Sequence, residues 1–391
     1  MSLLNQDTAI VYYTAYVSSL NFRTGLVGCI KGVIMLENHT GNNESEQKKA
    51  IQEQIAEILV GYELAPHEGM NSAHVGRWVD QFEERDRLFI LEQTLALLRN
   101  AYISKNDYEG IINAILRNEG DVSIIRHSAF LNIQEANRGS SQRDLLELLE
   151  IQAETFHEVD IVTLSRNVTS HRVAQFTSFI YFDDVCFSGT KALNDITWFV
   201  ENFNLSNVTI HVFFLGTHTY ATYMLETNLA RRFQRRNITL IIKKRGYLKT
   251  RENRLAYSAS SEVFWLRKNG IELPNWIQHP EIYTSREGSE RDHFSPTNIF
   301  PNRIDRYRFE YALTNAGFYI LQQSQNPAPI LKPLGFSTFS GLGFGGTIFT
   351  YRNCPNNTPL AFWWGRYERN GIPNWALDCW YPLMRRIGYN Q

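Results

Sequence analysis

The sequence predicts an α/β fold in which helices flank a parallel sheet, preceded by an N-terminal helical module. After Gly120, short apolar runs such as "VTIHVFFLG" alternate with amphipathic segments, a pattern typical of βαβ units covered on both faces. Before that point, apolar residues recur at helical spacing. With 43% hydrophobic and 20% charged residues, the composition is that of a globular chain with a sizeable core. We therefore expect a mainly helical module over residues 1–120 and an α/β domain over residues 121–391.

The N-terminal module is expected to be helical across residues 74–100, "HVGRWVDQFEERDRLFILEQTLALLRN". Apolar side chains share a face there and the charges fall on the other side. This arrangement favours a packing module over a recognition helix for a partner. The apolar positions are Val75, Trp78, Val79, Phe82, Leu88, Leu91, Leu95 and Leu98.

The α/β domain is predicted as strands and helices in alternation. The strands are expected in "DVSIIRHSAF", "VDIVTL", "QFTSFIYF", "VTIHVFFLG" and "ITLIIKK". Helices are expected in "SSQRDLLELLEIQAE", "TKALNDITWFVENF" and "YATYMLETNLARRFQRR". Residues 246–300 are rich in charged and turn residues, which indicates an insertion in this domain.

Charge and cysteine usage exclude several classes of protein. The 39 basic and 40 acidic residues nearly cancel, so the surface as a whole does not suit nucleic acid or anionic lipid. The four cysteines lack C-x-x-C spacing, which argues against a zinc ribbon and favours a reducing cytoplasm. We expect no membrane span, because no uncharged run reaches about 18 residues. The basic segment 231–254 could contact a nucleic-acid backbone, although such a run is more often a solvated helix end.

The stretch "SFIYFDDVCFSGTKALNDI" carries the strongest functional signal. Asp183 and Asp184 are expected to close an apolar strand, at the edge of a parallel sheet where ligands bind. The small residues from Ser188 to Thr190 precede a helix, whose free N–H groups attract phosphate. The two carboxylates would then face ribose hydroxyls or a magnesium ion. The alternative is a capped strand end without a ligand.

This stretch resembles the phosphoribosyl-pyrophosphate-binding motif of type I phosphoribosyltransferases. The resemblance implies that Asp183 and Asp184 contact the ribose 2′ and 3′ hydroxyls, with Mg²⁺ at the same acids. It also implies a cradle for the 5′-phosphate. The cradle residues are Cys186, Phe187, Ser188, Gly189, Thr190 and Lys191.

A second loop has the placement of the family's pyrophosphate loop. In "NRGSSQRDLLELL", small residues directly precede a helix, and Arg138 could supply charge to a pyrophosphate. A simple helix cap is the alternative reading. The predicted loop residues are Arg138, Gly139, Ser140 and Ser141.

The C-terminal stretch "FTYRNCPNNTPLAFWW", together with "RWVDQF", resembles the phosphoribosyltransferase-related PRTase-CE domain of bacterial conflict systems. Such proteins accompany retron reverse transcriptases and other antiviral modules, so the resemblance implies an operon-encoded partner. Asn356, Asn357 and Trp363 could contact a base through amide groups and stacking, with neighbouring Asn353 offering another amide. Core packing is the alternative for the adjacent tryptophans.

Three functions follow from these readings. The first is an enzyme that transfers or releases a ribosyl phosphate with Mg²⁺, through an oxocarbenium-like state that the protein stabilises by positioning and charge. The second is a sensor or regulatory subunit that binds a nucleotide without turnover. The third is a glycohydrolase that cleaves nucleotides or dinucleotide cofactors such as NAD, with water as the acceptor.

Overall fold

The computed structural model divides the chain into two compact units, Met1–Ala50 and Ile51–Gln391, which are described separately. Of the first unit, residues 43–50 are described, and they are helical. Residues 51–58 at the start of the second unit are helical as well. The structure describes residues 43–134, 141–156, 159–243, 249–253, 261–265, 273–277, 280, 295–324, 327–338, 341–368 and 374–386.

A parallel sheet forms the centre of the second unit, which confirms the predicted α/β class. Five described strands lie in the order β3-β2-β4-β5-β6, and β7 pairs with the same edge of β5 beyond the end of β6. Every pairing in this sheet is parallel. The strands are β2 (Ala129–Asn132), β3 (Thr163–Ser165), β4 (Ser178–Cys186), β5 (Val208–His218), β6 (Ile238–Ile242) and β7 (Lys249–Arg251).

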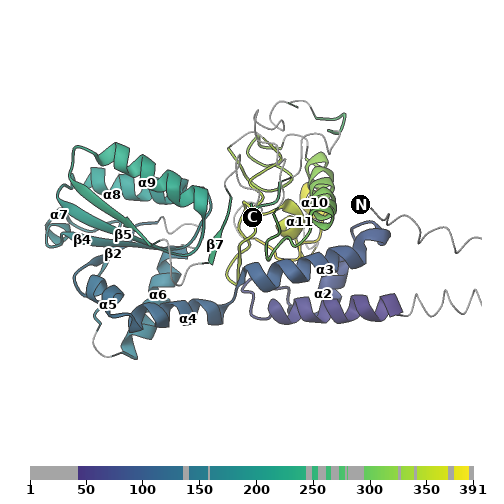
Figure 1. Ribbon diagram of the computed structural model, residues 1–391, viewed down its shortest axis with the longest axis horizontal. Helices are drawn as coiled ribbons and strands as arrows, with labels where there is room; N and C mark the ends of the chain where they lie inside the picture. The colour runs from purple at the N-terminus through teal and green to yellow at the C-terminus, as the bar shows by residue number, and fades with distance from the viewer. Residues whose placement is uncertain are drawn as a thin grey trace, which may run out of the picture. The chain divides into compact units, whose positions relative to one another are not determined.

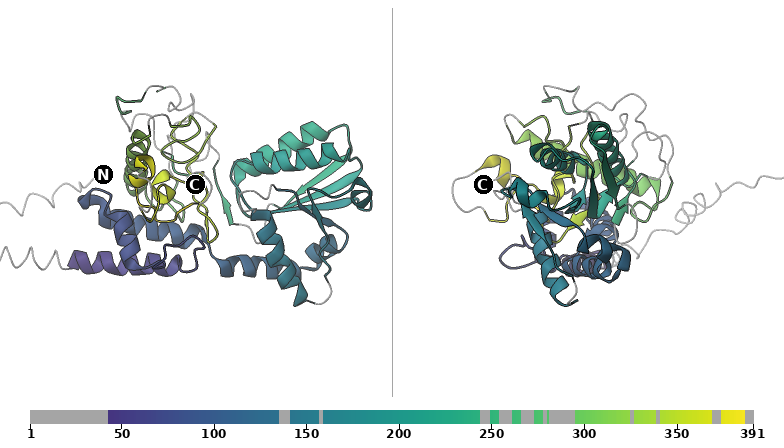
Figure 2. Two further views of the ribbon diagram at one scale, coloured as in Figure 1. Left: turned by 180° about the vertical axis from the view of Figure 1, so that it is seen from behind. Right: turned by 90° about the vertical axis from the view of Figure 1, so that its left-hand side faces the viewer.

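Helices cover both faces of the sheet (Figures 1 and 2). Side chains of α8 (Thr190–Asn202) and α9 (Thr219–Phe233) pack on the face that carries Phe179 and Tyr181. Alternate residues of the same strand point the other way. There Ile180 and Phe182 pack against α4 (Lys105–Arg117) and α6 (Ser141–Glu154). The short helix α7 (Ser170–Val173) precedes β4.

One predicted strand is wrong over its first part. Residues Glu119–Arg126 form helix α5, and β2 begins only at Ala129. The side chain of Asn118 caps the helix by accepting a hydrogen bond from the Asp121 amide at 3.0 Å. Buried Asp121 then binds Lys243 Nζ at 2.9 Å. The apolar residues of "VSII" are compatible with the 3.6-residue period of a helix and with the two-residue period of a strand. The Asn118 cap and the Asp121–Lys243 ion pair therefore determine that this segment is a helix.

The predicted helical stretch at residues 74–100 forms two helices, α2 (Ser72–Val79) and α3 (Glu84–Ala101). Their apolar faces pack against the C-terminal part of the chain. Trp78 Nε1 donates to the Ala361 carbonyl at 2.7 Å, and the Trp78 ring stacks on Phe362 at 5.7 Å between centroids. The C-terminal elements are α10 (Arg303–Gln322), α11 (Leu360–Trp363), α12 (Trp375–Asp378), and β8 (Phe349–Thr350), which pairs with β1 (Tyr102–Ile103).

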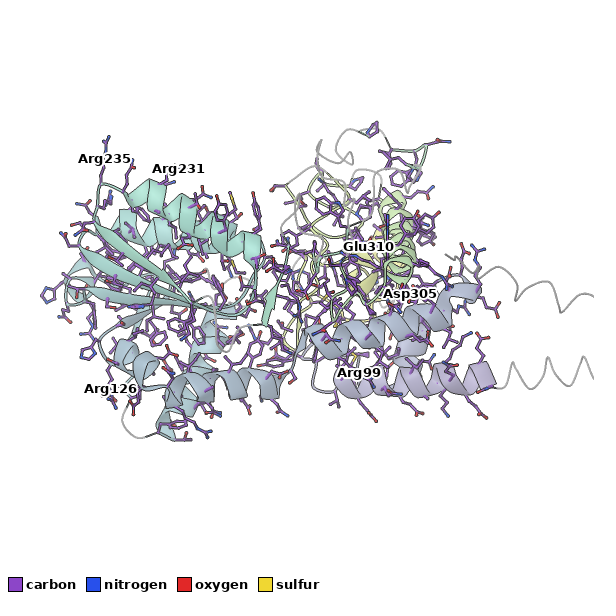
Figure 3. All side chains as sticks on the ribbon, viewed as in Figure 1. Arg99, Arg126, Arg231, Arg235, Asp305 and Glu310 are labelled. Carbon is purple, nitrogen blue, oxygen red and sulfur yellow. The ribbon has the colours of Figure 1, made fainter. Side chains whose placement is uncertain are left out.

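Part of the predicted insertion at 246–300 is described, and it is tied to α10 by a buried ion pair. Arg306 Nε lies 2.9 Å from Glu310 Oε1, and both side chains are almost fully buried. Arg306 also donates to the carbonyls of Ser261 and Val263. A buried pair needs such extra hydrogen bonds to offset its desolvation. Figure 3 shows Glu310 and Asp305 on α10, and Arg231 and Arg235 extending from the far end of α9.

Across the part of the chain that the structure describes, no helix combines the length and the apolar character needed to cross a membrane.

His74 joins α2 to the C-terminal segment and is held neutral. Its Nε2 lies 2.8 Å from the Leu383 carbonyl, so this nitrogen donates, and its Nδ1, 2.8 Å from the Tyr381 hydroxyl, accepts. Burial lowers the pKa of His74 to about 4. In the unfolded chain His74 is protonated below its ordinary pKa of 6.5, whereas in the folded state it stays neutral down to about pH 4.

We predict that acid destabilises the wild type more than a His74→Gln variant. Between pH 6.5 and 4 the unfolded state gains the proton first, so the free energy of unfolding should fall by up to about 3 kcal/mol through this residue. Urea unfolding at several pH values measures the difference in slope. Parallel pH profiles for the two proteins would contradict the assignment.

Candidate ligand-binding site

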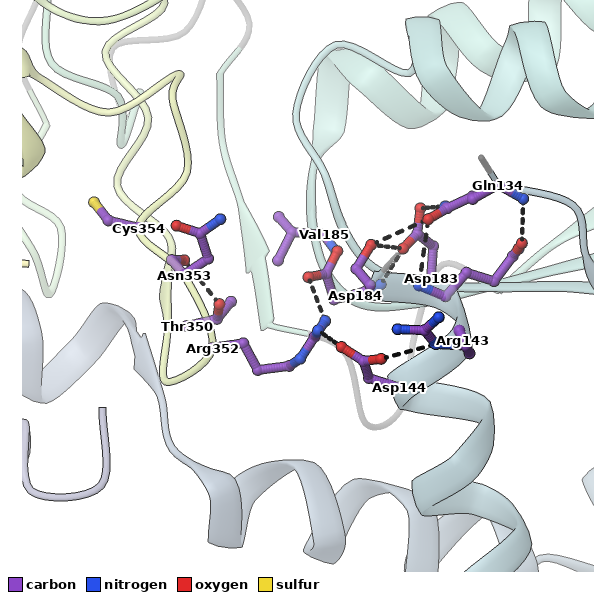
Figure 4. Close-up of polar contacts among 12 residues, drawn as sticks. Gln134, Arg143, Asp144, Asp183, Asp184, Val185, Thr350, Arg352, Asn353 and Cys354 are labelled. Atoms are coloured by element: carbon purple, nitrogen blue, oxygen red, sulfur yellow. Dashed lines mark hydrogen bonds and ion pairs between the residues drawn. The ribbon is translucent and has the colours of Figure 1, made fainter. Parts of the chain in front are cut away.

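Strand β4 runs through both aspartates and ends at Cys186, so the expectation that Asp183 and Asp184 close the strand is wrong. The pairing with β5 continues as far as Cys186 opposite Thr217. Successive strand residues point to opposite faces. The two carboxylates accordingly have different neighbours, as Figure 4 shows.

Asp183 is 4% exposed and its carboxylate is saturated with hydrogen bonds. Gln134 Nε2 and Ser141 Oγ each donate to it at 2.7 Å, and the Asp184 amide donates at 3.0 Å. The Tyr181 hydroxyl lies at 3.2 Å, and Lys191 Nζ at 3.8 Å. Because these groups occupy its oxygens, Asp183 holds the start of α6 against β4.

Tyr181 links Asp183 to a third carboxylate. Its hydroxyl lies 2.8 Å from Asp195 Oδ2 as well as 3.2 Å from Asp183 Oδ2. A phenol has one proton, so it donates to only one of them at a time. Burial raises the pKa of Asp195, and a proton there would let the phenol donate to Asp183. This buried network fixes the position of Asp183.

Asp184 is the more accessible of the two acids. Its side chain is 21% exposed, Oδ1 accepts from the Val185 amide at 2.7 Å, and Oδ2 lies 3.9 Å from Arg352 Nη1. Burial and the charge of Asp183 raise the pKa of Asp184 to about 6, although Arg352 opposes the shift. Asp184 therefore combines partial exposure with a pKa near neutrality.

Arg352 is a site residue that the sequence reasoning missed. It follows β8 and binds Asp144 in the first turn of α6, 208 residues earlier in the chain. Burial lowers the pKa of Arg352, but the carboxylates of Asp184 and Asp144 outweigh it and leave the pKa raised. No local pattern marks an arginine whose partners are so distant in sequence. Its position within the quoted "FTYRNCPNN" was the only available signal.

The predicted phosphate cradle follows β4 directly. Cys186 is buried, and burial together with Asp183 raises the pKa of its thiol to about 12. Ser188 Oγ accepts from the Thr190 amide at 3.3 Å and lies 3.1 Å from the Thr190 hydroxyl. Thr190 and Lys191 are exposed. The hydroxyl, amide and ammonium donors of residues 188–191 thus gather at the start of α8.

Gly189 makes this turn possible. Its φ of +75° lies in the left-handed region, where a side chain is strained. A Cβ at this position would also lie 2.9 Å from the Ala221 carbonyl and 3.3 Å from Leu225 Cβ. Glycine is therefore required both for the turn and for the close approach of α8 to α9.

The two neighbouring helix N-termini differ in how they are capped. At α8 the N-cap residue, Gly189, has no side chain, and the Thr190 amide donates to the partly exposed Ser188 Oγ at 3.3 Å. At α9, by contrast, the buried side chain of Asn253 accepts from the Tyr220 amide at 2.7 Å. Free N–H groups at a helix start attract anions. Between the two, α8 is the helix start that suits a phosphate.

The predicted pyrophosphate loop is described only at its end. Arg138, Gly139 and Ser140 lie outside the described residues. Ser141 is the first residue of α6 and donates to Asp183 Oδ1. The functional and capping readings of this loop both stay predictions.

The predicted base-contacting residues are distributed around the C-terminal core. Trp363 is 1% exposed, and its Nε1 donates to the Thr358 carbonyl at 2.9 Å. Asn357 Nδ2 donates to the Phe336 carbonyl at 2.9 Å, and the Asn356 carbonyl accepts from the Phe336 amide at 2.8 Å. These contacts tie the three residues to neighbouring backbone and do not join them to Asp184.

We predict opposite effects for the two aspartates. Asp183→Asn places an amide among hydrogen-bond donors and should lower the free energy of unfolding by about 2–3 kcal/mol. Asp184→Asn keeps an acceptor for Val185. It also removes an acid whose contribution to stability declines as pH rises from 3.8 to about 6. Above pH 6 this variant should be at least as stable as the wild type. Urea unfolding at pH 8 measures both variants. If Asp184→Asn were less stable than Asp183→Asn, the different roles assigned to the two aspartates would be contradicted.

Gly189→Ala should lower stability by about 1–3 kcal/mol, because the new Cβ meets strain and the Ala221 carbonyl. Gly110→Ala in α4 is the matched control. A Cβ there has nothing within 4 Å, and alanine in a helix interior should stabilise by about 0.5–1 kcal/mol. Thermal unfolding of both proteins gives the comparison. Equal midpoints would refute the close contact.

A comparison with protein families matches residues 75–386 to the PRTase-CE family. No curated protein and no solved structure matches the chain.

Proposed function

The chain belongs to the PRTase-CE family, and from this premise we propose that it binds a phosphorylated ribose, either phosphoribosyl pyrophosphate or a nucleotide. The observation that carries the proposal is the start of α8, where the N-cap Gly189 has no side chain, five residues after the partly exposed carboxylate of Asp184. Both lie at the carboxyl edge of a parallel sheet, the edge at which such folds bind ligands.

In this proposal each group has a separate task. The hydroxyls of Ser188 and Thr190 and the backbone N–H groups at the start of α8 receive the 5′-phosphate, and the exposed Lys191 adds positive charge. Asp184 accepts a hydrogen bond from a ribose hydroxyl, while Asp183 holds the strand in place. Arg352 faces the diphosphate side, where its guanidinium suits a phosphate oxygen pair. Arg138 and Ser140, which lie outside the described residues, remain the residues proposed from the sequence to bind the pyrophosphate.

Magnesium is part of the proposal. Among the described residues no three His, Cys, Asp or Glu side chains could together hold a metal ion. Mg²⁺ commonly binds through one or two carboxylates plus substrate phosphates, and Asp184 fits that role better than the saturated Asp183. When bound, the ion would neutralise charge on a departing diphosphate.

The proposed reaction is transfer of the ribosyl phosphate. The bond between the anomeric carbon and its leaving group breaks, and an acceptor bonds to that carbon. A nucleotide glycohydrolase is the second candidate, favoured by the pKa of about 6 at Asp184, which suits a base that takes a proton from water. A nucleotide-binding regulatory subunit without turnover is the third, since Asp183 is committed to holding the fold.

The setting of the protein is also a proposal. The PRTase-CE resemblance supports a cytoplasmic role in bacterial antiviral defence beside a reverse transcriptase or another operon-encoded protein. Nucleic acid could bind at the basic segment 231–254. In the described part of that segment, Lys243 and Arg232 pair with acids of this chain. Arg231 of α9 and Arg235, two residues after this helix, extend outward (Figure 3) and form no ion pair with the described residues, so nucleic-acid contact would begin there.

We predict that the wild type binds phosphoribosyl pyrophosphate in the presence of Mg²⁺ and that Asp184→Asn weakens binding about 10- to 100-fold. The variant loses a charged acceptor for a ribose hydroxyl. Asp80→Asn, an exposed acid outside the sheet, serves as the control and should bind like the wild type. Isothermal titration gives the affinities, and repetition with EDTA tests the ion.

Product assays separate the candidate functions. Pyrophosphate released in the presence of a nucleobase supports the transferase, and free base released from a nucleotide supports the glycohydrolase. Binding with neither product supports the regulatory subunit. Absence of binding by folded wild type to both phosphoribosyl pyrophosphate and nucleotides would refute the proposal.

A further inference from the structure

His218 is a buried histidine beside the proposed phosphate loop. It is the last residue of β5, directly before α9, and is 0% exposed. Its ring lies against Phe187 at 5.0 Å with an interplanar angle of 37° and edge-on to Phe344 at 5.2 Å. Phe187 opens the same loop that is proposed to cradle the phosphate. His218 is therefore separated from the loop by one aromatic ring.

Neither ring nitrogen of His218 has a hydrogen-bond partner within the described chain. The Cys186 backbone is near enough to favour the protonated ring, but without the geometry of a hydrogen bond. Each buried polar group left unpaired typically costs about 1–3 kcal/mol. A phenylalanine between Phe187 and Phe344 would avoid that penalty, so stability does not explain a histidine here. An unpaired polar group in such a position calls for a functional explanation.

The ring is neutral, which limits what it can recognise. Burial and the charge of Arg251 lower the pKa of His218 to about 3. The backbones of His218 and Arg251 are direct neighbours across the β5–β7 pair. A neutral imidazole offers one donor and one acceptor. It therefore suits an uncharged group with both functions, such as the edge of a nucleobase, whereas a phosphate would prefer Arg251.

We propose that His218 contacts the nucleobase of a bound nucleotide and that Phe187 covers it while the loop is unfilled. The inference rests on the proposed function, because the base is placed by a ribose phosphate held at residues 188–191. Phe187 and the cradle belong to one loop, so filling the cradle and uncovering His218 are linked through the backbone between them. The histidine then gains the two hydrogen bonds that it lacks in the ligand-free fold.

The test compares two kinds of ligand, with and without a base, and variants of two histidines. Ribose 5-phosphate lacks a base, whereas AMP, GMP, CMP and UMP each carry one. His218→Phe should weaken binding of at least one monophosphate by about tenfold or more, through loss of two hydrogen bonds, and leave ribose 5-phosphate unchanged. His211→Phe is the matched control. His211 lies on the same strand, is 8% exposed and has a ring nitrogen without a hydrogen-bond partner among the described residues, but it is seven residues from His218.

Stability and a conservative variant complete the design. His218→Phe should unfold at the same temperature as the wild type or higher, so weakened binding would not reflect a damaged fold. His218→Gln retains a donor and an acceptor and should recover part of the affinity. If ribose 5-phosphate binds but His218→Phe leaves all four monophosphate affinities unchanged, the inference fails and the proposed function stands. If the wild type binds neither kind of ligand, both fail.

Discussion

The parallel pairing of β4 with β5 is the constraint on which the site depends. Its register places Cys186 beside Thr217, so both strands deliver their carboxyl ends to one edge of the sheet. Each strand is followed by a helix, α8 after β4 and α9 after β5. These two helices can lie close together only because Gly189 has no side chain. The Asp184 carboxylate, the start of α8 and His218 are brought together by these hydrogen bonds. A change of register would separate them.

The C-terminal segment completes this edge from outside the sheet. Gly216 of β5 has no side chain, and a Cβ there would lie 3.2 Å from Ile103 and 3.4 Å from Ile348. Because Gly216 has no side chain, Ile103 of β1 and Ile348, which precedes β8, can both pack against its backbone. Phe344 packs on Phe187, and Arg352 reaches the acids from the same segment. The sheet supplies the two aspartates and leads into the start of α8. The C-terminal segment supplies Arg352, and Phe344, which packs on Phe187.

Sequence reasoning recovered the parallel sheet because β5 is a long, largely apolar run whose type does not depend on distant partners, and shorter apolar runs alternate with helices around it. It failed at α5, where "VSII" fits a helix or a strand and the Asn118 cap decides. At the site, the motif from Asp183 to Lys191 was found because its residues are contiguous. The different surroundings of the two aspartates follow from strand alternation, which was overlooked because the strand was expected to close at these two residues. Arg352 and His218 have no local signature, since their roles depend on partners brought near by folding.

The helices α2 and α3 lack a complete core of their own. The indole of Trp78 in α2 donates to the Ala361 carbonyl, and in the segment before α2 the Tyr62 hydroxyl donates to the Arg385 carbonyl at 2.6 Å. During synthesis these helices leave the ribosome long before residues 361–385 exist, so their apolar faces stay uncovered while most of the chain is made. Such a delay exposes a nascent chain to aggregation and to chaperones. The residues that cover these helices follow Arg352 closely along the chain, so during synthesis Arg352 and the cover of these helices become available at nearly the same time.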